Sequence, residues 1–146
     1  MSTTVKQDLA GLKVLGFDTL ILTDGTTTNF DFGTPNDIDL STNANYAPGD
    51  RVLVAFAGRA AAAQTTDAIT WIVQDADDSS GSIGTPATAV TSVVEGALVG
   101  AVTEDVCVLA VTVQNGRPWI RCSGDMQGTS DDYHVSCTVF AVPTDV

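Results

Sequence analysis

The sequence predicts an all-β protein, an antiparallel β-sandwich that is jelly-roll-like, and three observations lead to this fold class. The acidic residues are sixteen Asp and only two Glu, and Asp favours turns whereas Glu favours helices. Val and Thr, which both favour strands, are abundant. Short alternating segments are separated by polar stretches that contain Gly, Pro and Asn, which is the pattern of a sandwich built from short strands.

The length and composition predict one folded domain preceded by an arm. The chain has 146 residues, of which 44% are hydrophobic, and this is enough for a single packed core. We expect an N-terminal arm over residues 1–16 and one β-sandwich domain over residues 17–146. Gly11 and Gly16 disfavour a helix in the arm, so we expect it to run extended over a neighbouring molecule. The apolar residues of the arm, which are its predicted contacts, are Val5, Leu9, Leu12 and Leu15.

Alternation and turn signals predict eight or nine short strands after the arm. The Asn115-Gly116 pair is the strongest hairpin signal, and it predicts a type I′ turn that joins the strands on either side. Asp24-Gly25 is a second hairpin signal. We expect loops over residues 58–67 and 123–132. The eight or nine strands are expected among ten candidate segments, which are residues 19–22, 29–32, 37–40, 51–57, 69–74, 90–94, 97–102, 106–114, 117–122 and 133–142.

The charge balance excludes two classes of partner. Lys and Arg total 6 against 18 acidic residues, for a net charge of −12, so neither nucleic acid nor an anionic membrane is an expected partner. The N-terminus lacks a signal-peptide pattern, and no apolar run is long enough to cross a membrane. Three Cys without a secretion signal favour reduced, buried thiols in the cytoplasm.

No residue pattern predicts catalysis, a cofactor or a metal. His134 is the only His, and it alternates away from the apolar face of its strand, whereas Cys137 lies on the opposite face. No nucleophile elbow, P-loop or zinc spacing occurs. The Asp75–Asp78 loop begins like a Ca²⁺ loop, but Ser80 stands where Gly is needed and Pro86 where Glu is needed. We interpret its carboxylates as solvated turn residues and predict that the protein is not an enzyme.

Two tryptophans are candidates for a binding surface. Trp71 lies on an alternating apolar face and is predicted to be in the core. Trp119 is flanked by Arg117 and Arg121, which share its face if the segment is a strand. Trp and Arg are enriched at protein interfaces, so these three residues are candidate partner contacts. A core Trp with Arg at its rim fits the same pattern.

Four stretches resemble small capsid cement proteins, the head decoration proteins of tailed bacteriophages. The resemblance covers roughly residues 50–146. It implies a jelly-roll or related β-sandwich that binds the outside of a shell made of the major capsid protein of the same phage. It also implies homotrimers at local three-fold positions, synthesis in the host cytoplasm and a final location on the capsid surface of the virion. The stretches are WIVQDADD from residue 71, GTPA from 84, NGRPWI from 115 and TVFAVP from 138.

The composition agrees with that role, and two alternatives stay open. The Ala- and Val-rich strands carry few long charged side chains, which suits flat contacts between subunits. One alternative is another phage structural β-domain, such as a tail or fibre module. The other is a carbohydrate-binding β-sandwich, which requires Trp119 or Tyr133 to be exposed beside the acidic loops.

Overall fold

The computed structural model describes residues 11–22, 29–33, 37–60, 68–85, 91–95, 104–127 and 133–144. Within these ranges the chain forms nine β-strands and no helix, which confirms the predicted all-β class. Since the described residues contain no helix, they contain none that could span a membrane. The strands are β1 (Lys13–Leu22), β2 (Asn29–Asp31), β3 (Ile38–Asp39), β4 (Arg51–Ala60), β5 (Ala68–Ala76), β6 (Thr91–Glu95), β7 (Glu104–Val111), β8 (Trp119–Gln127) and β9 (Tyr133–Val142).

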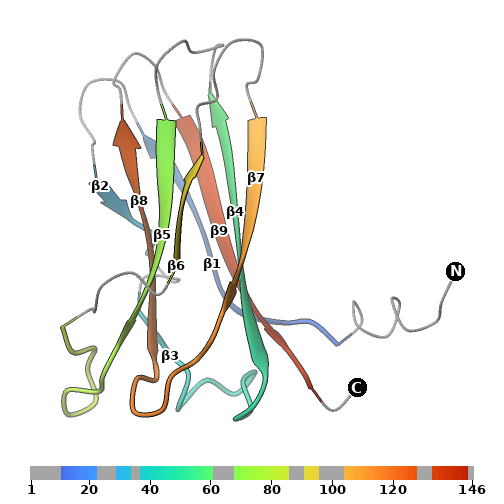
Figure 1. Cartoon of the computed structure of the whole chain (residues 1–146), viewed down its shortest axis with the longest axis vertical. Helices are drawn as coiled ribbons and strands as arrows, with labels where there is room; N and C mark the ends of the chain where they lie inside the picture. The colour runs from blue at the N-terminus through green and yellow to red at the C-terminus, as the bar shows by residue number, and fades with distance from the viewer. Residues whose placement is uncertain are drawn as a thin grey trace, which may run out of the picture.

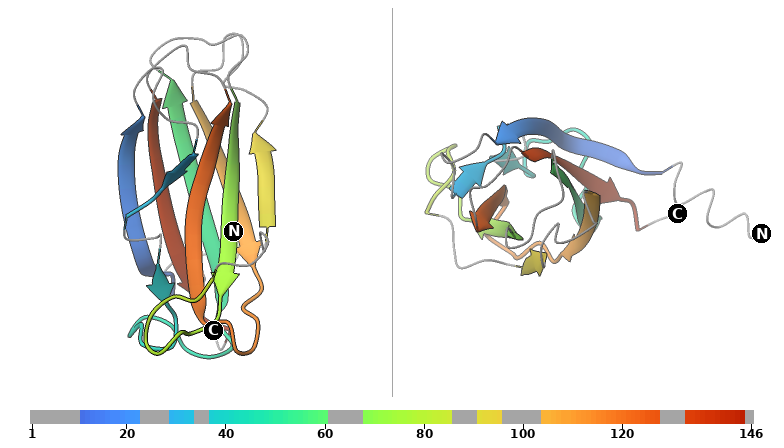
Figure 2. Two further views of the ribbon diagram at one scale, coloured as in Figure 1. Left: turned by 90° about the vertical axis from the view of Figure 1, so that its left-hand side faces the viewer. Right: turned by 90° about the horizontal axis from the view of Figure 1, so that it is seen from above.

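The strands form two antiparallel sheets that face each other (Figures 1 and 2). Sheet A has the order β1-β9-β4-β7, and sheet B has the order β2-β8-β5-β6 with β3 also paired to β8. The pairings are nested along the chain: β1 pairs with β9, β2 and β3 with β8, β4 with β7, and β5 with β6. The chain is thus arranged like one long hairpin that is rolled into a sandwich.

The core lies between the sheets and is built on aromatic rings. Phe56 of sheet A stacks on Trp71 of sheet B, with ring centroids 4.9 Å apart and planes 9° from parallel. Phe30 and Phe32 pack on this pair at edge or tilted angles. Trp71 is 2% exposed, so the prediction that it is a core residue is confirmed. The alternating buried residues of β4 and β9 line the other side of the core.

Two strands extend further than the sequence predicts, because glycines in them serve packing rather than turns. β4 continues to Ala60 and β8 continues to Gln127, through the starts of the predicted loops. A side chain at residue 58 would press on the Trp71 ring, and one at residue 124 would collide with the Phe30 ring. Glycine in a strand marks such close approaches. The predicted strand at 97–102 lies outside the described residues.

The predicted type I′ hairpin at Asn115-Gly116 is wrong. The Arg117 amide donates to the Gln114 carbonyl across 3.1 Å, so a turn is present, but only Gly116 has a positive φ, of 80°. A type I′ turn needs positive φ at both central residues. β7 belongs to sheet A and β8 to sheet B, so this turn carries the chain between sheets. β1 and β2, which lie on either side of the Asp24-Gly25 signal, also belong to different sheets. The predicted turn at Asp24-Gly25 itself lies outside the described residues.

The first strand begins earlier than predicted. β1 starts at Lys13, so residues 13–16 of the predicted arm belong to sheet A, where Lys13 stands opposite Ala141 of the last strand. A bulge places Leu15 as an extra residue between the paired positions of Val14 and Gly16. The Val14 and Leu15 carbonyls accept hydrogen bonds from the side-chain amides of Asn45 (2.9 Å) and Asn43 (3.2 Å). The side chains of the loop between β3 and β4 thereby satisfy the two backbone carbonyls at the bulge.

Candidate functional site: the outer face of sheet A

The middle of the outer face of sheet A carries apolar or uncharged side chains from edge to edge. Strand register aligns its outward residues in rows across β1, β9, β4 and β7. We call these residues the apolar face. They are Val14, Phe17, Thr19 and Ile21 of β1; Leu53, Ala55 and Ala57 of β4; Val106, Val108 and Ala110 of β7; and Ser136, Thr138 and Phe140 of β9.

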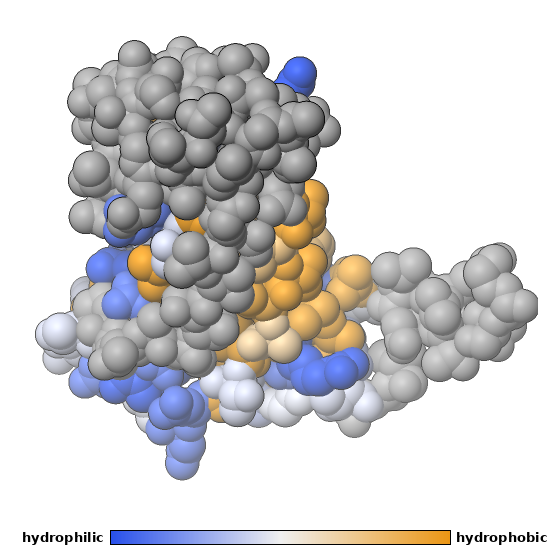
Figure 3. Space-filling model, turned by 45° about the horizontal axis from the view of Figure 1, so that its top comes forward, coloured by the Kyte–Doolittle hydropathy of each residue, from blue (hydrophilic) through white to orange (hydrophobic). Residues whose placement is uncertain are grey.

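The large side chains of this face are exposed to a degree that is unusual for apolar residues in a strand. The exposed fraction is 55% for Phe17, 64% for Ile21, 68% for Val106 and 59% for Val108. An antiparallel sheet that meets water on one side normally carries polar residues there, and contiguous apolar patches of several hundred Å² mark interaction sites. Hydrophobic residues gather on the flank of the body where β4 and β7 lie (Figure 3).

The apolar face has a ridge along each edge and a shallow groove between them. The bulky exposed side chains stand on the edge strands β1 and β7. The central strands β4 and β9 present small residues along most of their length, such as Ala55, Ala57 and Ser136. At one end the groove deepens into a depression of about 510 Å³ that runs between Ile21 and Val106. Arg59 and His134 line this end of it.

Charged groups lie at the ends of the apolar face and not within it. None of its thirteen residues is ionisable, although the chain carries a net charge of −12. Arg59 stands in register with His134 on one side and with Glu104 on the other. These residues form the end row of the face, which Ile21 shares because it lies opposite His134. Lys13 and Arg51 lie at the opposite end of sheet A. The middle of the face is therefore suited to close contact with another apolar surface.

The outer face of sheet B is polar by comparison. Its central strands β5 and β8 present Thr70, Gln74, Ser123 and Asp125 at outward positions, with the apolar Ile72 between Thr70 and Gln74. Arg121, which also lies on this face, donates to Asp37 at 2.8 Å. This is the ordinary arrangement of a sheet with one solvated side.

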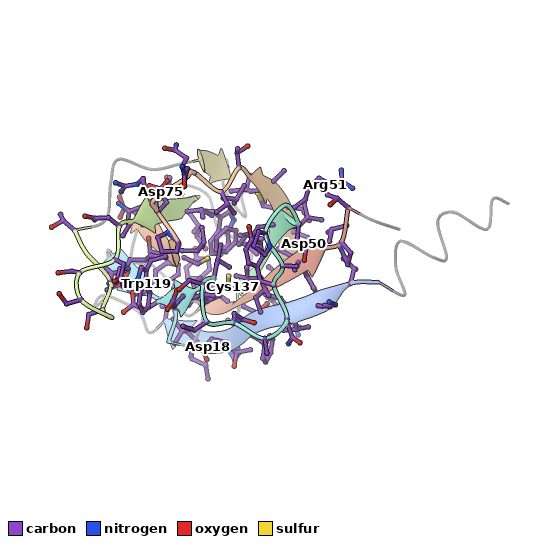
Figure 4. The ribbon with its side chains drawn as sticks, turned by 90° about the horizontal axis from the view of Figure 1, so that it is seen from below. Asp18, Asp50, Arg51, Asp75, Trp119 and Cys137 are labelled. Carbon is purple, nitrogen blue, oxygen red and sulfur yellow. The ribbon has the colours of Figure 1, made fainter. Side chains whose placement is uncertain are left out.

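The predicted contacts Arg117, Trp119 and Arg121 all have partners within the chain. Arg117 lies before β8, and its Nε is 2.6 Å from Oδ1 of Asp75 while Nη2 donates to the Asp75 carbonyl at 3.0 Å. The Nε1 of half-buried Trp119 donates to Asp78 at 3.1 Å. Figure 4 shows Asp75 and Trp119 on the same side of the molecule. Arg117 and Trp119 therefore fasten the start of β8 to the loop after β5, and their role in binding a partner stays a prediction.

The acidic loop is organised by these same contacts. Asp75 is 3% exposed, and its second carboxylate oxygen has no hydrogen-bond partner among the described residues. Asp78 accepts from Trp119 and from the Gly81 amide, at 3.1 Å in each case. Across the part of the chain that the structure describes, no three His, Cys, Asp or Glu residues are grouped so as to hold a metal ion.

Two of the four predicted arm contacts, Leu12 and Leu15, lie within the described residues. Val5 and Leu9 lie outside the described residues. Leu12 is half-buried, and Leu15 is a core residue with 8% exposure. Leu15 is thus committed to the sandwich itself.

All three cysteines are core residues, and two of them, Cys122 and Cys137, meet there, a point that the sequence left open. Cys107 and Cys137 stand opposite Phe56 from its two neighbouring strands, and Cys137 lies between the sheets (Figure 4). A side-chain hydrogen bond with Cys137 raises the pKa of Cys122, and burial raises it further. All three are buried thiols outside any disulfide, whereas His134 is exposed on the other side of β9. No activated Cys–His pair is formed by these residues.

Comparison with known proteins adds no family to this geometry. No protein-family model matches the chain, and no curated protein matches it.

Proposed function

We propose that this protein is a structural virion protein of the cement type. In this role it binds the outer surface of a tailed-phage capsid, links neighbouring capsomers and stabilises the expanded head. The observation that carries the proposal is the apolar face, whose thirteen outward residues include no ionisable one although the chain is acidic. Such a surface marks a subunit whose working state is an assembly.

The arrangement of polar groups supports a structural role over an enzymatic one. The depression on the apolar face has Arg59 and His134 at one end and apolar or small residues elsewhere. A catalytic site needs a nucleophile or an acid–base pair held within hydrogen-bond reach, and the Cys thiols lie in the core instead. We therefore propose no reaction and no cofactor.

The nested strand pairing supports the jelly-roll part of the resemblance. A jelly roll is an eight-stranded double sheet formed by folding a long hairpin upon itself. If β2 and β3 are counted as one interrupted strand, the two sheets here have four strands each in that order. Jelly rolls occur in viral capsid proteins, so the fold is compatible with the proposed location on the virion.

The proposed mechanism is multivalent attachment. Each copy contributes modest contacts to the major capsid protein, and many copies on one shell raise the free energy needed to separate capsomers. A copy that binds the expanded shell more tightly than the unexpanded one shifts the equilibrium toward expansion. The acidic surface keeps many copies soluble and is repelled by the packaged DNA.

The carbohydrate-binding alternative loses its two candidate platforms. Tyr133 is 1% exposed. Trp119 is half-buried, and its Nε1 is engaged by Asp78. Neither ring is available as an open stacking surface beside the acidic loop, so we do not propose this function.

The test uses heads of the phage that encodes this chain, made without it. Purified protein is mixed with expanded and with unexpanded heads, and bound protein is measured by sedimentation. We expect saturable binding to expanded heads and a higher temperature of head disruption. Absence of co-sedimentation with expanded heads would exclude the cement function. Equal binding to both forms would exclude stabilisation of the expanded state.

A further inference from the structure

We propose that the apolar face of each molecule is covered by a second copy of this chain, with an edge ridge of one copy seated in the β4–β9 groove of the other. This inference goes beyond shell binding, because it assigns an occupant to a surface whatever the assembly attaches to. Three properties of the face select a second copy over other partners: its charge, its shape and its size.

The distribution of charge favours a partner with the same charge. A chain of net charge −12 repels its own copies over most of its surface. A basic partner would be recognised through carboxylates, yet none of the thirteen residues of the apolar face carries one. The apolar face is where a second acidic molecule can approach without like charges being buried together.

The shape of the face is complementary to itself. Phe17 and Ile21 form a ridge on β1, and Val106 and Val108 form one on β7. Ala55 and Ala57 are small, and the groove above them reaches about 510 Å³ at its deeper end. One molecule thus presents both the projecting and the receiving element. Sheets pack face to face at about 10 Å when side chains interdigitate in this way.

The size of the face is that of the apolar centre of an interface. The four strands of sheet A, at about 4.8 Å spacing and about 3.3 Å per residue over about five residues, present about 300 Å² of projected apolar surface. Stable interfaces bury about 800 Å² per partner with a polar rim around the centre, so the end rows of sheet A and the relief of the ridges supply the rest. Burial of the apolar centre on both partners, at about 25 cal/mol per Å², gives a gross driving force of about 15 kcal/mol, before the cost of association.

Symmetry leaves two ways to close such an assembly. If two copies exchange ridges, the interface is isologous and the product is a dimer. If each copy gives its ridge to the next, the contact is heterologous and closes as a ring, as in the trimer that the resemblance implies. In both cases a second copy covers the apolar face, and the mass in solution distinguishes the dimer from the ring.

The experiment compares the full chain with two variants that carry the same substitution on opposite sides of the molecule. Thr138→Arg places a long cation in the groove of the apolar face. Thr70→Arg is the matched control, because Thr70 is also an outward, half-buried Thr on a central strand, opposite Asp125 of sheet B. Both variants lower the net negative charge equally, so any loss of association cannot come from added repulsion. Mass is measured by light scattering on a sizing column at about 100 µM.

We expect two or three times 15.1 kDa for the full chain and for Thr70→Arg, and the monomer mass for Thr138→Arg with an unchanged thermal transition of the fold. A monomeric full chain would overturn the inference, and so would a Thr138→Arg variant that keeps the assembly. If Thr138→Arg unfolds, Val108→Lys on the exposed ridge replaces it, with the same expected loss. The head-binding assay is scored separately. If the chain self-associates but does not bind heads, only the cement function is excluded. If the chain is a monomer that binds heads, only the self-association through the apolar face is excluded.

Discussion

The outer faces of the two sheets are built on the same backbone plan and carry opposite chemistry. Each has central strands flanked by edges, and each turns an apolar side toward the shared core. On sheet B the outward positions are largely polar, with Thr70, Gln74 and Asp125 among them. On sheet A the middle rows are apolar or uncharged, and the charged residues stand at the ends. Inward residues specify the sandwich, and outward residues specify what the folded molecule meets.

Ionic groups follow the same division. On the side of sheet B they are paired within the chain, as Arg117 is with Asp75 and Arg121 with Asp37. On sheet A the cations Arg51 and Arg59 lie at the ends of the face. Sheet B therefore uses its charges to hold its own loops, whereas sheet A keeps the middle of its face free of charge.

The largest expected effect comes from placing charges on the ridge of sheet A. The double variant Val106→Lys/Val108→Lys should weaken self-association by at least about a hundred-fold, because burying each Val contributes about 1.5–3 kcal/mol and tenfold corresponds to about 1.4 kcal/mol. The matched double variant on sheet B is Thr70→Lys/Ile72→Lys, which should change the association constant by less than about threefold. Sedimentation equilibrium measures both.

Equal losses in the two double variants would contradict the division between the faces. They would mean that added cations act through the overall charge and not through a particular surface. A loss in the sheet B variant alone would move the interface to that side of the molecule.

The next effect concerns stability and is expected on the side of sheet B. Arg117→Ala leaves the Asp75 carboxylate buried with no cation beside it, which typically costs about 3–5 kcal/mol. Urea denaturation should show this loss in the unfolding free energy of a monomeric background such as Thr138→Arg. Adding Asp75→Asn should restore part of it, since the uncompensated charge is then removed. If Arg117→Ala is neutral, the ion pair does not hold the loop.

Arg121→Ala provides a smaller effect for the same comparison. Its partner Asp37 is 40% exposed at the side chain, and exposed pairs contribute about 0–1 kcal/mol. We expect a loss in unfolding free energy below about 1 kcal/mol and no change in association. A loss as large as that of Arg117→Ala would show that burial does not separate the two pairs.

The sequence predicts the core of this protein better than its surface. The alternation of β9 predicted its bounds and both of its faces, because buried and outward residues differ clearly there. Pairing was not predicted correctly at Asn115-Gly116, since a turn signal is local and does not say which strands become neighbours. The strand bounds at Gly58 and Gly124 were missed because the need for glycine comes from rings that lie far away in the sequence.

The apolar face was visible in the sequence only in part. The run 51–57 is apolar at both alternations, and Val106–Val111 repeats this pattern, which indicated strands suited to flat contacts. The sequence did not show that these strands share one sheet, or that Phe17 and Ile21 continue the same face across β9. Those relations are non-local. The candidates Arg117, Trp119 and Arg121 were chosen by composition, and the structure gives each of them a partner inside the chain.

The smallest expected effect is a dependence on pH, which should differ in sign between the unfolding free energy and self-association through the apolar face. At the end of β3, Asp39 accepts hydrogen bonds from the Ser41 amide (2.9 Å) and hydroxyl (2.6 Å) and from the Thr42 hydroxyl (3.0 Å). Burial raises the pKa of Asp39, but these hydrogen bonds outweigh it, so the pKa lies below its ordinary value. The folded pKa is thus lower than the unfolded one, which is about 3.9. Its contribution to stability is complete above the unfolded pKa and is lost as pH falls through the folded pKa.

The unfolding free energy of the full chain should therefore exceed that of Asp39→Asn by about 0.5 kcal/mol from pH 7 to pH 5, as for an exposed group, and this difference should shrink below about pH 4. Self-association should respond with the opposite sign. Acid lowers the net negative charge, and the apolar face has no carboxylate of its own to protonate, so repulsion between copies falls and association tightens. If acid weakened both quantities together while the fold remained intact, carboxylates would have to lie within the interface, and the apolar face would not be its centre.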